Sequence, residues 1–210
     1  MTEAGTAPVT RSGTREAASE PGRGTGRLKA DRVSREDWLT KGLQIIGQTG
    51  PGGIRIDQVC RAMKVTKGSF YWHFQDRQDL LDKLFLHWRA RETTALIDFV
   101  ETRYDAPADR IRHVVAFVTF GDYDVATEVA MRQWGQADDK VRAGLQEVDA
   151  ERLDFFTRQF AALGFGPAEA RLRAITVYSL TLSCGYMLTG ESREELERRM
   201  RASMELLLVH

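Results

Sequence analysis

The sequence predicts an all-α protein, with an N-terminal three-helix domain that contains a helix-turn-helix and a larger C-terminal helical domain. Two observations support this prediction. Apolar residues recur every three or four positions in successive segments from residue 38 onward, which is the period of an amphipathic helix. Residues that favour helix starts precede these segments, and glycine and proline separate them.

The first 32 residues differ from the rest in composition. They are rich in Gly, Ala, Thr, Ser, Arg and Glu and nearly lack large apolar side chains. Such a stretch cannot bury enough apolar surface to offset the entropy of ordering. We therefore expect a disordered tail over residues 1–32, a helix-turn-helix domain over residues 33–77 and a C-terminal domain over residues 78–210.

Three short helices are expected in the N-terminal domain. Ser34 stands before an acidic first turn, as the N-cap of a helix does, and the glycine-rich run at residues 49–53 ends that helix. The second helix is predicted from about Ile56 to Met63. The third begins after a tight turn of two or three residues, with Thr66 as its cap.

The C-terminal domain is expected to consist of further helices. Asp76 is the predicted cap of a long helix, and Pro107 marks the start of the next. The helices after these are predicted at about residues 124–134, 138–163, 168–188 and 193–208. The helix over 168–188 is apolar almost all round, so it must be buried on several sides. Ser192 opens the last helix with a capping box.

The composition is that of an ordinary globular protein, with 42% hydrophobic and 29% charged residues. The apolar runs are too short for a membrane span, the N-terminus lacks an apolar signal core, and two cysteines suit a reducing compartment, so we expect a cytoplasmic protein without a membrane partner. The net charge of zero hides an asymmetry. Residues 27–77 carry ten basic and five acidic side chains, whereas residues 78–210 carry 17 basic and 22 acidic ones. This difference favours a polyanion-binding head.

The segment from Val59 to Leu81, VCRAMKVTKGSFYWHFQDRQDLL, has the pattern of a helix, a tight turn and a second helix. Such a unit places its second helix in the major groove of DNA. Phe70 and Phe74 lie four residues apart, so they are expected to pack together in the domain core. The remaining side chains suit phosphate oxygens and base edges, and they are Thr66, Lys67, Gly68, Ser69, Tyr71, Trp72 and His73.

The run from Val65 to Phe74, followed by Asp76-Arg77 and Leu80-Leu81, resembles the signature of the TetR family of transcriptional regulators. The resemblance covers roughly residues 34–85. It implies a sequence-specific repressor that reads a palindromic DNA operator as a homodimer, and a phosphate contact by Arg77. It also implies that a ligand in the C-terminal domain moves the connecting helix, about residues 76–103. The two heads then no longer match the groove spacing of about 34–36 Å.

Two positions depart from the family pattern. Arg55 replaces the usual small N-cap of the second helix, whose side chain would satisfy an end N–H. Lys64 stands where the turn usually holds glycine, and a left-handed backbone there costs about 1 kcal/mol. A contact between Lys64 and a phosphate would offset this cost. In the tail, a basic arm that enters the minor groove is left open by Arg23, Arg27, Lys29 and Arg32.

Aromatic and polar side chains of the C-terminal domain are candidates for the lining of an apolar ligand cavity. The predicted lining residues are Trp88, His113, Phe117, Phe120, Tyr123, Met131, Arg132, Trp134, Phe155 and Tyr178. The alternative for each of them is ordinary core packing. The effector is an unknown small molecule, and an apolar or aromatic one is the general expectation.

The last two helices, about residues 168–188 and 193–208, are the predicted homodimer contact. Pairing of the apolar helix with its symmetry mate would form an isologous four-helix interface. The alternative is that this helix is the buried central helix of a monomer.

The sequence contains no phosphate loop, nucleophile elbow or paired-carboxylate constellation. His87 and His113 stand without Cys or acidic partners at ligand spacing, so we expect no metal site. These features argue against an enzyme and predict no cofactor. Two other functions stay open, a helical ligand-binding protein and a transcriptional activator or nucleoid-type DNA binder of the same fold.

Overall fold

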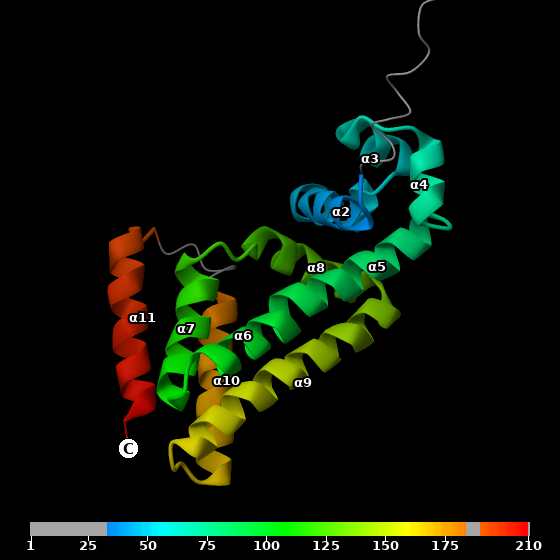
Figure 1. The fold of residues 1–210 in the computed structure, drawn as a ribbon. Coiled ribbons are helices and arrows are strands. Elements are labelled where there is room, and N and C mark those ends of the chain that lie inside the picture. The colour runs from blue at the N-terminus through cyan, green and yellow to red at the C-terminus, as the bar shows by residue number, and fades with distance from the viewer. Residues whose placement is uncertain (1–32, 184–189, 210) are drawn as a thin grey trace, which may run out of the picture.

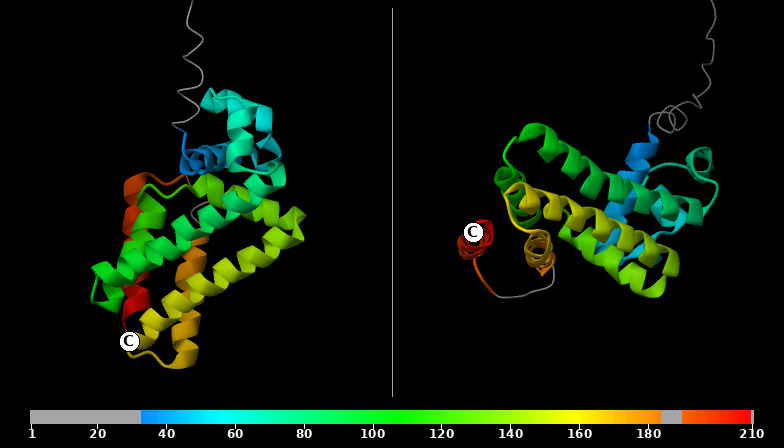
Figure 2. Two further views of the ribbon diagram at one scale, coloured as in Figure 1. Left: turned by 45° about the vertical axis from the view of Figure 1, so that its right-hand side comes forward. Right: turned by 90° about the horizontal axis from the view of Figure 1, so that it is seen from below.

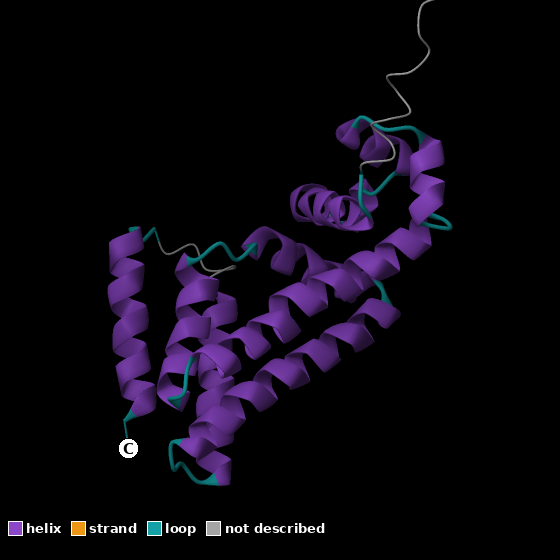
Figure 3. Cartoon of the chain, in the orientation of Figure 1, coloured by secondary structure: helices purple, strands orange, loops and turns teal. Residues whose placement is uncertain are grey.

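A computed structural model of the chain describes residues 33–183 and 190–209 (Figure 1). Every regular element within these two stretches is helical (Figure 3), which confirms the all-α prediction. The predictions of a disordered tail and of a basic arm over residues 1–32 lie outside the described residues, as does the predicted end of a helix at residues 184–188. None of the helices in the described stretches has both the length and the apolar character needed to cross a membrane.

The helices follow the predicted order along the chain. The α-helices are α2 (Arg35–Thr49), α3 (Ile56–Met63), α4 (Lys67–His73), α5 (Arg77–Arg89), α6 (Ala95–Arg103), α7 (Pro107–Phe120), α8 (Val125–Ala137), α9 (Asp139–Ala162), α10 (Pro167–Ser183) and α11 (Arg193–Leu208). Two short elements were not predicted from the sequence, a 3₁₀ turn η1 (Pro51–Gly53) and a π-helical turn η2 (Ala90–Thr94).

Most helices begin at the predicted caps. Ser34 and Ser192 each form a capping box, with Asp37 and Glu195 as the reciprocal partners, and Asp76 caps α5. Thr66 differs from the prediction, because it precedes α4 but its hydroxyl accepts no hydrogen bond from that helix. The start of α4 is exposed, so water can satisfy its first N–H groups without a side-chain cap.

The helix predicted over about residues 76–103 is confirmed in its extent but is not uniform. It consists of α5, η2 and α6, with the π-helical turn near its middle. Its first half leads away from α4, and its second half lies beside α7 (Figure 1). One continuous helical path therefore connects the N-terminal helices with the C-terminal core. Isolated π-turns of this kind occur frequently at functional sites.

The apolar side chains form two cores. The first joins α2, α3, α4 and the first half of the connecting path to α8 and α9, and its largest members are Trp38, Phe70, Phe74, Trp88 and Trp134. The second lies among α6, α7, α9, α10 and α11 and includes Phe155, Phe160 and Val177. The long helix α9 packs along both α8 and α10 and so contributes to both cores (Figure 2). The first core crosses the proposed boundary between residues 77 and 78.

Helix α10 keeps an apolar outer face in the single chain. Leu172 is 65% exposed and Ile175 is 44% exposed, although the opposite face of α10 is fully buried. On α11, Leu206 is 80% exposed. The expectation that this apolar helix is buried on several sides is therefore not met by one chain alone.

Candidate functional site

The turn between α3 and α4 has a left-handed backbone at Lys64, with φ of 57°, as the sequence predicted. The N–H of Lys64 donates to the carbonyl of Arg61, and the N–H of Val65 donates to the carbonyl of Cys60 over 3.0 Å. These bonds satisfy carbonyls at the end of α3 and fix the direction in which α4 leaves the turn. The side chain of Lys64 is exposed.

Helix α4 is divided between a buried and an exposed face. Phe70 and Phe74 are buried and lie edge-on to Trp38 of α2, with ring centroids 5.7 and 6.1 Å away. This packing confirms the core assignment of both phenylalanines. Tyr71 is 57% exposed and Trp72 is 87% exposed. A seven-residue helix that turns two large rings toward solvent is unusual for a surface with no partner.

The other predicted DNA contacts take different positions. Thr66, Lys67 and Gly68 are exposed, and the Lys67 ammonium lies 2.6 Å from the Asp57 carboxylate of α3. Ser69 was expected to face outward with them, but it is buried, and His73 is half-buried with its ring beside that of Trp38. The reason is geometric, because residues four apart share a helix face and these two flank the buried Phe70.

Arg77 ties the start of α5 to the turn before α3. Its Nε donates to the carbonyl of Ile54 over 2.6 Å, and its Nη2 donates to the carbonyl of Pro51 over 2.8 Å. These bonds hold η1 against the helix that leads to the C-terminal core. The guanidinium still lies at an exposed position, close to the end of α4. Arg77 therefore has a structural role whether or not it also binds a phosphate.

A second candidate site is a partly enclosed cavity of about 50 Å³ between η2, α6, α7, α8, α9 and α10, which we call the internal cavity. A volume of this size has room for a few water molecules. Most of its wall is apolar, and these residues are Leu96, Ile97, Val114, Val118, Val125, Val129, Phe155, Phe156 and Leu182. One part of the wall is polar and consists of Glu92, Thr93, Tyr123, Glu128, Arg152, Tyr178 and Thr181.

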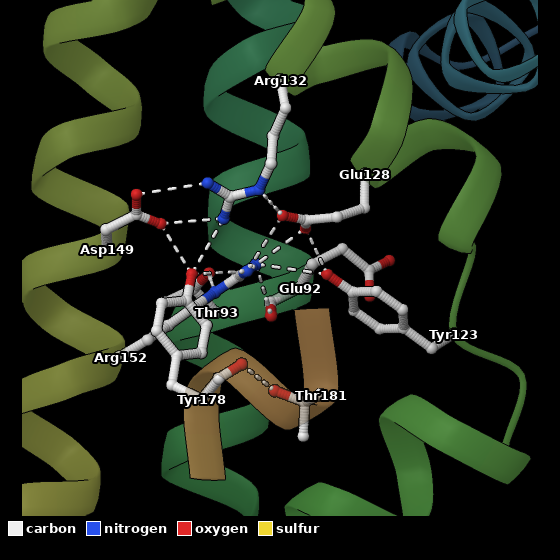
Figure 4. Close-up of polar contacts among 9 residues, drawn as sticks. All are labelled: Glu92, Thr93, Tyr123, Glu128, Arg132, Asp149, Arg152, Tyr178 and Thr181. Atoms are coloured by element: carbon white, nitrogen blue, oxygen red, sulfur yellow. Dashed lines mark hydrogen bonds and ion pairs between the residues drawn. The ribbon is translucent and has the colours of Figure 1, made fainter. Parts of the chain in front are cut away.

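The polar wall belongs to a buried network centred on Arg152 of α9 (Figure 4). The Arg152 Nη1 donates to both oxygens of Glu128 over 3.2 and 3.3 Å, and its Nε donates to the Thr93 hydroxyl over 2.9 Å. Its Nη2 donates to the carbonyl of Glu92 and to the Tyr123 hydroxyl. The Tyr123 hydroxyl in turn donates to Glu128. One guanidinium thus joins α9 to α8, to η2 and to the loop before α8.

A second arginine extends this network behind the cavity wall. Arg132 donates to Glu128 over 2.7 Å and to both oxygens of Asp149 over 2.8 and 3.2 Å. The Tyr178 hydroxyl donates to Asp149 over 2.6 Å and accepts from Arg132 over 2.8 Å. Figure 4 shows Arg132 and Asp149 on one side of Tyr178 and the cavity-facing Thr181 on the other.

The network fixes the charge state of its members. Burial alone would raise the pKa of Glu128, but the charges of Arg152 and Arg132 outweigh burial and hold the pKa below its ordinary value. Burial likewise opposes ionisation of Asp149, but hydrogen bonds from Arg132 and Tyr178 lower its pKa. Burial raises the pKa of Tyr178 to about 12 and that of Tyr123 well above its ordinary value. At neutral pH the network therefore contains charged arginines and carboxylates and neutral tyrosines.

Only some of the predicted ligand contacts reach this cavity. Tyr123, Phe155 and Tyr178 line it, and Arg132 lies behind Tyr178. Trp88, Met131 and Trp134 are buried in the first core instead. They were misplaced because large apolar side chains at helical spacing look the same in either core.

Three further candidates lie at the surface of the second core. The His113 ring accepts or donates a hydrogen bond with the Tyr104 hydroxyl over 2.8 Å and, with Phe117, borders a shallow surface pocket. Phe120 borders a groove between α7 and α11. These positions do not line the internal cavity.

Sequence reasoning missed the charged part of the cavity wall. Glu92, Thr93, Glu128 and Arg152 were not among the candidates, because charged helical residues usually lie in water. A signal was present in α9, where Arg152 lies between Val148 and Phe155 on the apolar side of the helix. A charge within an apolar stripe needs buried partners.

Comparison with known proteins finds a match for the N-terminal helices. Residues 39–84 match the family model described as bacterial regulatory proteins, tetR family, which confirms the resemblance seen in the sequence. A curated relative, the HTH-type transcriptional regulator AcrR of Shigella flexneri, is 30% identical over 73 residues. These residues are 35% of this chain and 32% of AcrR, so the chain matches about a third of the length of this relative.

Solved structures resemble the whole described fold at low sequence identity. A transcriptional regulator from Rhodococcus sp. Rha1 has a TM-score of 0.68 at 15% identity over 84% of this chain and 96% of that one. FadR from Bacillus subtilis, in complex with stearoyl-CoA, has a TM-score of 0.63 at 14% identity over 84% of this chain and all of that one. AibR, in complex with isovaleryl coenzyme A and operator DNA, has a TM-score of 0.61 at 16% identity, over 83% of this chain and 97% of that chain. These likenesses show the fold, including its two-part helical arrangement.

Proposed function

Since residues 39–84 form a helix-turn-helix of the tetR family of bacterial regulatory proteins, we propose that this chain is a sequence-specific DNA-binding transcriptional regulator. In this proposal it is a homodimeric repressor that leaves a palindromic operator when a small molecule binds. The proposed DNA-contacting residues are Thr66, Lys67, Gly68, Ser69, Tyr71, Trp72, His73 and Arg77.

The exposed face of α4 is the observation that carries the proposal. Tyr71 and Trp72 project from a short helix whose opposite face is locked to α2, so the exposed rings cannot turn into the core. Lys67 adds a positive charge beside them. Rings, a hydroxyl and a cation on a rigid helix suit a major groove, where they meet thymine methyls, base edges and phosphates. The protein AibR, which shares the fold, was solved with operator DNA.

Release by a ligand is supported by the position of the cavity. Glu92 and Thr93 of η2 and Leu96 of α6 lie in its wall, and these residues belong to the path that begins beside α4. A molecule larger than a few waters must displace some of this wall, because the cavity holds only about 50 Å³. A displacement of the connecting path would move the two heads of a dimer relative to each other.

The dimer is supported by the exposed apolar faces of α10 and α11. Leu172, Ile175 and Leu206 are side chains that a second copy of the chain would cover. Pairing of these two helices with their symmetry mates gives the isologous four-helix interface predicted from the sequence.

FadR and AibR, which share the fold, were solved with stearoyl-CoA and isovaleryl coenzyme A, so acyl-CoA compounds are the alternative class of effector to a small uncharged molecule. The apolar part of the cavity wall would suit a short acyl chain. A cavity of about 50 Å³ is too small for a stearoyl chain unless the surrounding helices separate.

Selection of bound duplexes from a randomised DNA library, with purified protein at near-physiological salt, tests the proposed function. We expect a palindrome whose half-sites lie about one helical turn or more apart, bound roughly 10³-fold more tightly than random DNA. Uniform affinity with a steep dependence on salt would instead identify a nucleoid-type binder. Recovery of no bound DNA would favour a helical ligand-binding protein.

Matched variants then assign the recognition helix. Lys67→Ala removes a lysine whose ammonium lies 2.6 Å from Asp57, and Lys140→Ala removes one that lies 2.6 Å from Asp82 of α5, outside α4. We expect Lys67→Ala and Tyr71→Ala each to weaken operator binding by about ten-fold or more, and Lys140→Ala to leave it unchanged. Unchanged affinity in both α4 variants would remove this assignment.

A further inference from the structure

We propose that the internal cavity selects an uncharged effector with a hydroxyl group, a small alcohol or phenol, whose apolar part lies against α6 and α7. This inference rests on the proposed function, because it names the class of molecule that would act at the cavity. It follows from the charges, the hydrogen bonds and the size of the cavity wall.

The charges of the polar wall are already balanced. Arg152 and Arg132 face Glu128 and Asp149, and the remaining buried carboxylate, Glu92, accepts from Arg91 over 2.6 Å. Three cations thus stand against three anions. An anionic ligand would have to compete with Glu128, which is 4% exposed and accepts from both buried arginines. The displaced carboxylate would then be left without compensation in the interior.

A cationic ligand is disfavoured by the same arrangement. Its charge would enter a space beside the Arg152 guanidinium, which is itself buried and forms part of the wall. The only carboxylate of the wall that is not bonded to Arg152 or Arg132 is Glu92, and that carboxylate is paired with Arg91. An uncharged head group neither displaces Glu128 nor places a cation beside Arg152, since it adds no charge to a neutral cluster.

The hydrogen-bonding capacity that remains in the wall suits a hydroxyl. Tyr123 and Tyr178 both donate to carboxylates and accept from arginines, so their hydroxyls are already engaged. The Thr93 hydroxyl accepts a hydrogen bond from Arg152, so its proton is available to donate to a ligand. The Thr181 hydroxyl donates to the carbonyl of Tyr178, so its oxygen is available to accept a hydrogen bond from a ligand. One donor and one acceptor on the wall match the acceptor and donor of a ligand hydroxyl.

The apolar side of the cavity limits the rest of the molecule. Leu96, Ile97, Val114, Val118 and Phe156 present only aliphatic and aromatic surface. With about 50 Å³ available, a compact ring or short branched chain displaces the wall least. A ligand of this kind gains apolar burial on one side and a paired hydroxyl on the other.

Calorimetry on the full chain without DNA tests the head group. The probes share one ring and differ in one substituent: 4-methylphenol, 4-methylbenzoate, 4-methylbenzylamine and toluene, with cyclohexylmethanol as the aliphatic alcohol. We expect at least one hydroxyl probe to bind ten-fold or more tightly than toluene, the anion and the amine. Tightest binding of the anion or the amine, equal binding of toluene, or no binding by any probe overturns the proposal.

Two threonine variants locate the hydroxyl. Thr181→Val removes a hydroxyl of the cavity wall, and Thr176→Val removes one from the same helix outside it, where the hydroxyl donates to the carbonyl of Leu172. We expect Thr181→Val to weaken the binding of 4-methylphenol about ten-fold without changing the affinity for toluene. Thr176→Val should change neither affinity. Equal effects of the two variants contradict the assignment. Because operator selection needs no ligand and calorimetry needs no DNA, failure of the ligand class and failure of the regulator proposal are distinguishable.

Discussion

Helix α4 and the network around Arg152 depart from ordinary burial in opposite directions. Helix α4 exposes Tyr71 and Trp72, side chains that proteins usually bury, whereas the network buries Glu128 and Arg152, side chains that proteins usually leave in water. Each arrangement gives up free energy of folding. The exposed rings forgo apolar burial, and the buried charges lose their hydration.

The two regions differ in how many other residues depend on the exposed or buried side chain. Trp72 touches little of the fold, so its removal should leave the rest of the structure unchanged. Glu128 accepts from two arginines and a tyrosine, so its removal leaves three partners without compensation. Residues that contact few others, such as Trp72, are thus suited to a contact surface. Residues whose hydrogen bonds join several segments, such as Glu128, are suited to a site where a bound ligand shifts those segments together.

The largest expected effect lies within α4 itself. Phe74→Ala should lower the free energy of unfolding by about 3–5 kcal/mol, because it truncates a buried ring between Trp38 and Phe70. Trp72→Ala, two residues away, should change it by less than about 0.5 kcal/mol. Urea denaturation of both variants measures the difference. Similar losses would mean that the two faces of α4 are not distinct.

The next effect compares a buried with an exposed carboxylate. Glu128→Gln should cost about 3 kcal/mol, because it leaves Arg152 and Arg132 buried with one fewer anion. Glu147→Gln is the matched control, since Glu147 lies 2.6 Å from Arg89 but is largely exposed. Its cost should stay below about 1 kcal/mol. Equal costs in chemical denaturation would show that the network is not interdependent.

The dependence of the free energy of unfolding on alkaline pH tests the same network. Because burial raises the pKa of Tyr178 to about 12 in the folded chain, against about 10 in an unfolded one, its contribution is complete below pH 10 and is lost as the pH rises toward 12. We expect the free energy of unfolding to fall over that range. Tyr178→Phe should reduce the slope. An unchanged slope in Tyr178→Phe would exclude this origin.

The smallest expected effect is at the turn before α4. Lys64→Gly relieves a left-handed backbone and should stabilise the chain by up to about 1 kcal/mol. If Lys64 contacts a phosphate, the same variant should weaken operator binding although it is more stable. Thermal denaturation together with an affinity measurement separates the two effects. A loss of stability would contradict the strain argument.

The sequence predicted the fold better than the cavity. Local signals such as the N-cap at Ser34, the capping box at Ser192 and the strained turn at Lys64 depend on neighbouring residues, and all three were confirmed. Glu128 and Arg132 stand four apart, a spacing that is common for ion pairs on exposed helix surfaces. Their burial depends on α9 and α10, which the sequence of α8 does not contain.

Several of the predicted ligand contacts lie away from the cavity for a related reason. Trp88 and Trp134 have the same helical spacing as true cavity residues, but they fill the first core. Whether an apolar side chain fills a core or lines a cavity is decided by the packing of helices distant in the sequence. The polar partners Thr93 and Thr181 carry no local signal at all, since a threonine within a helix is ordinary.

The π-helical turn at Ala90–Thr94 has a consequence for the orientation of the two ends of the connecting path. Such a turn holds one residue more than an α-helical turn, so the helix after it is rotated by about 100° relative to an uninterrupted one. Leu84 and Trp88 face the first core, and Leu96 and Val100 face the second, which an unbroken α-helix would not align in this way. The extra residue therefore sets the rotation of the cavity wall about the helix axis relative to the N-terminal helices.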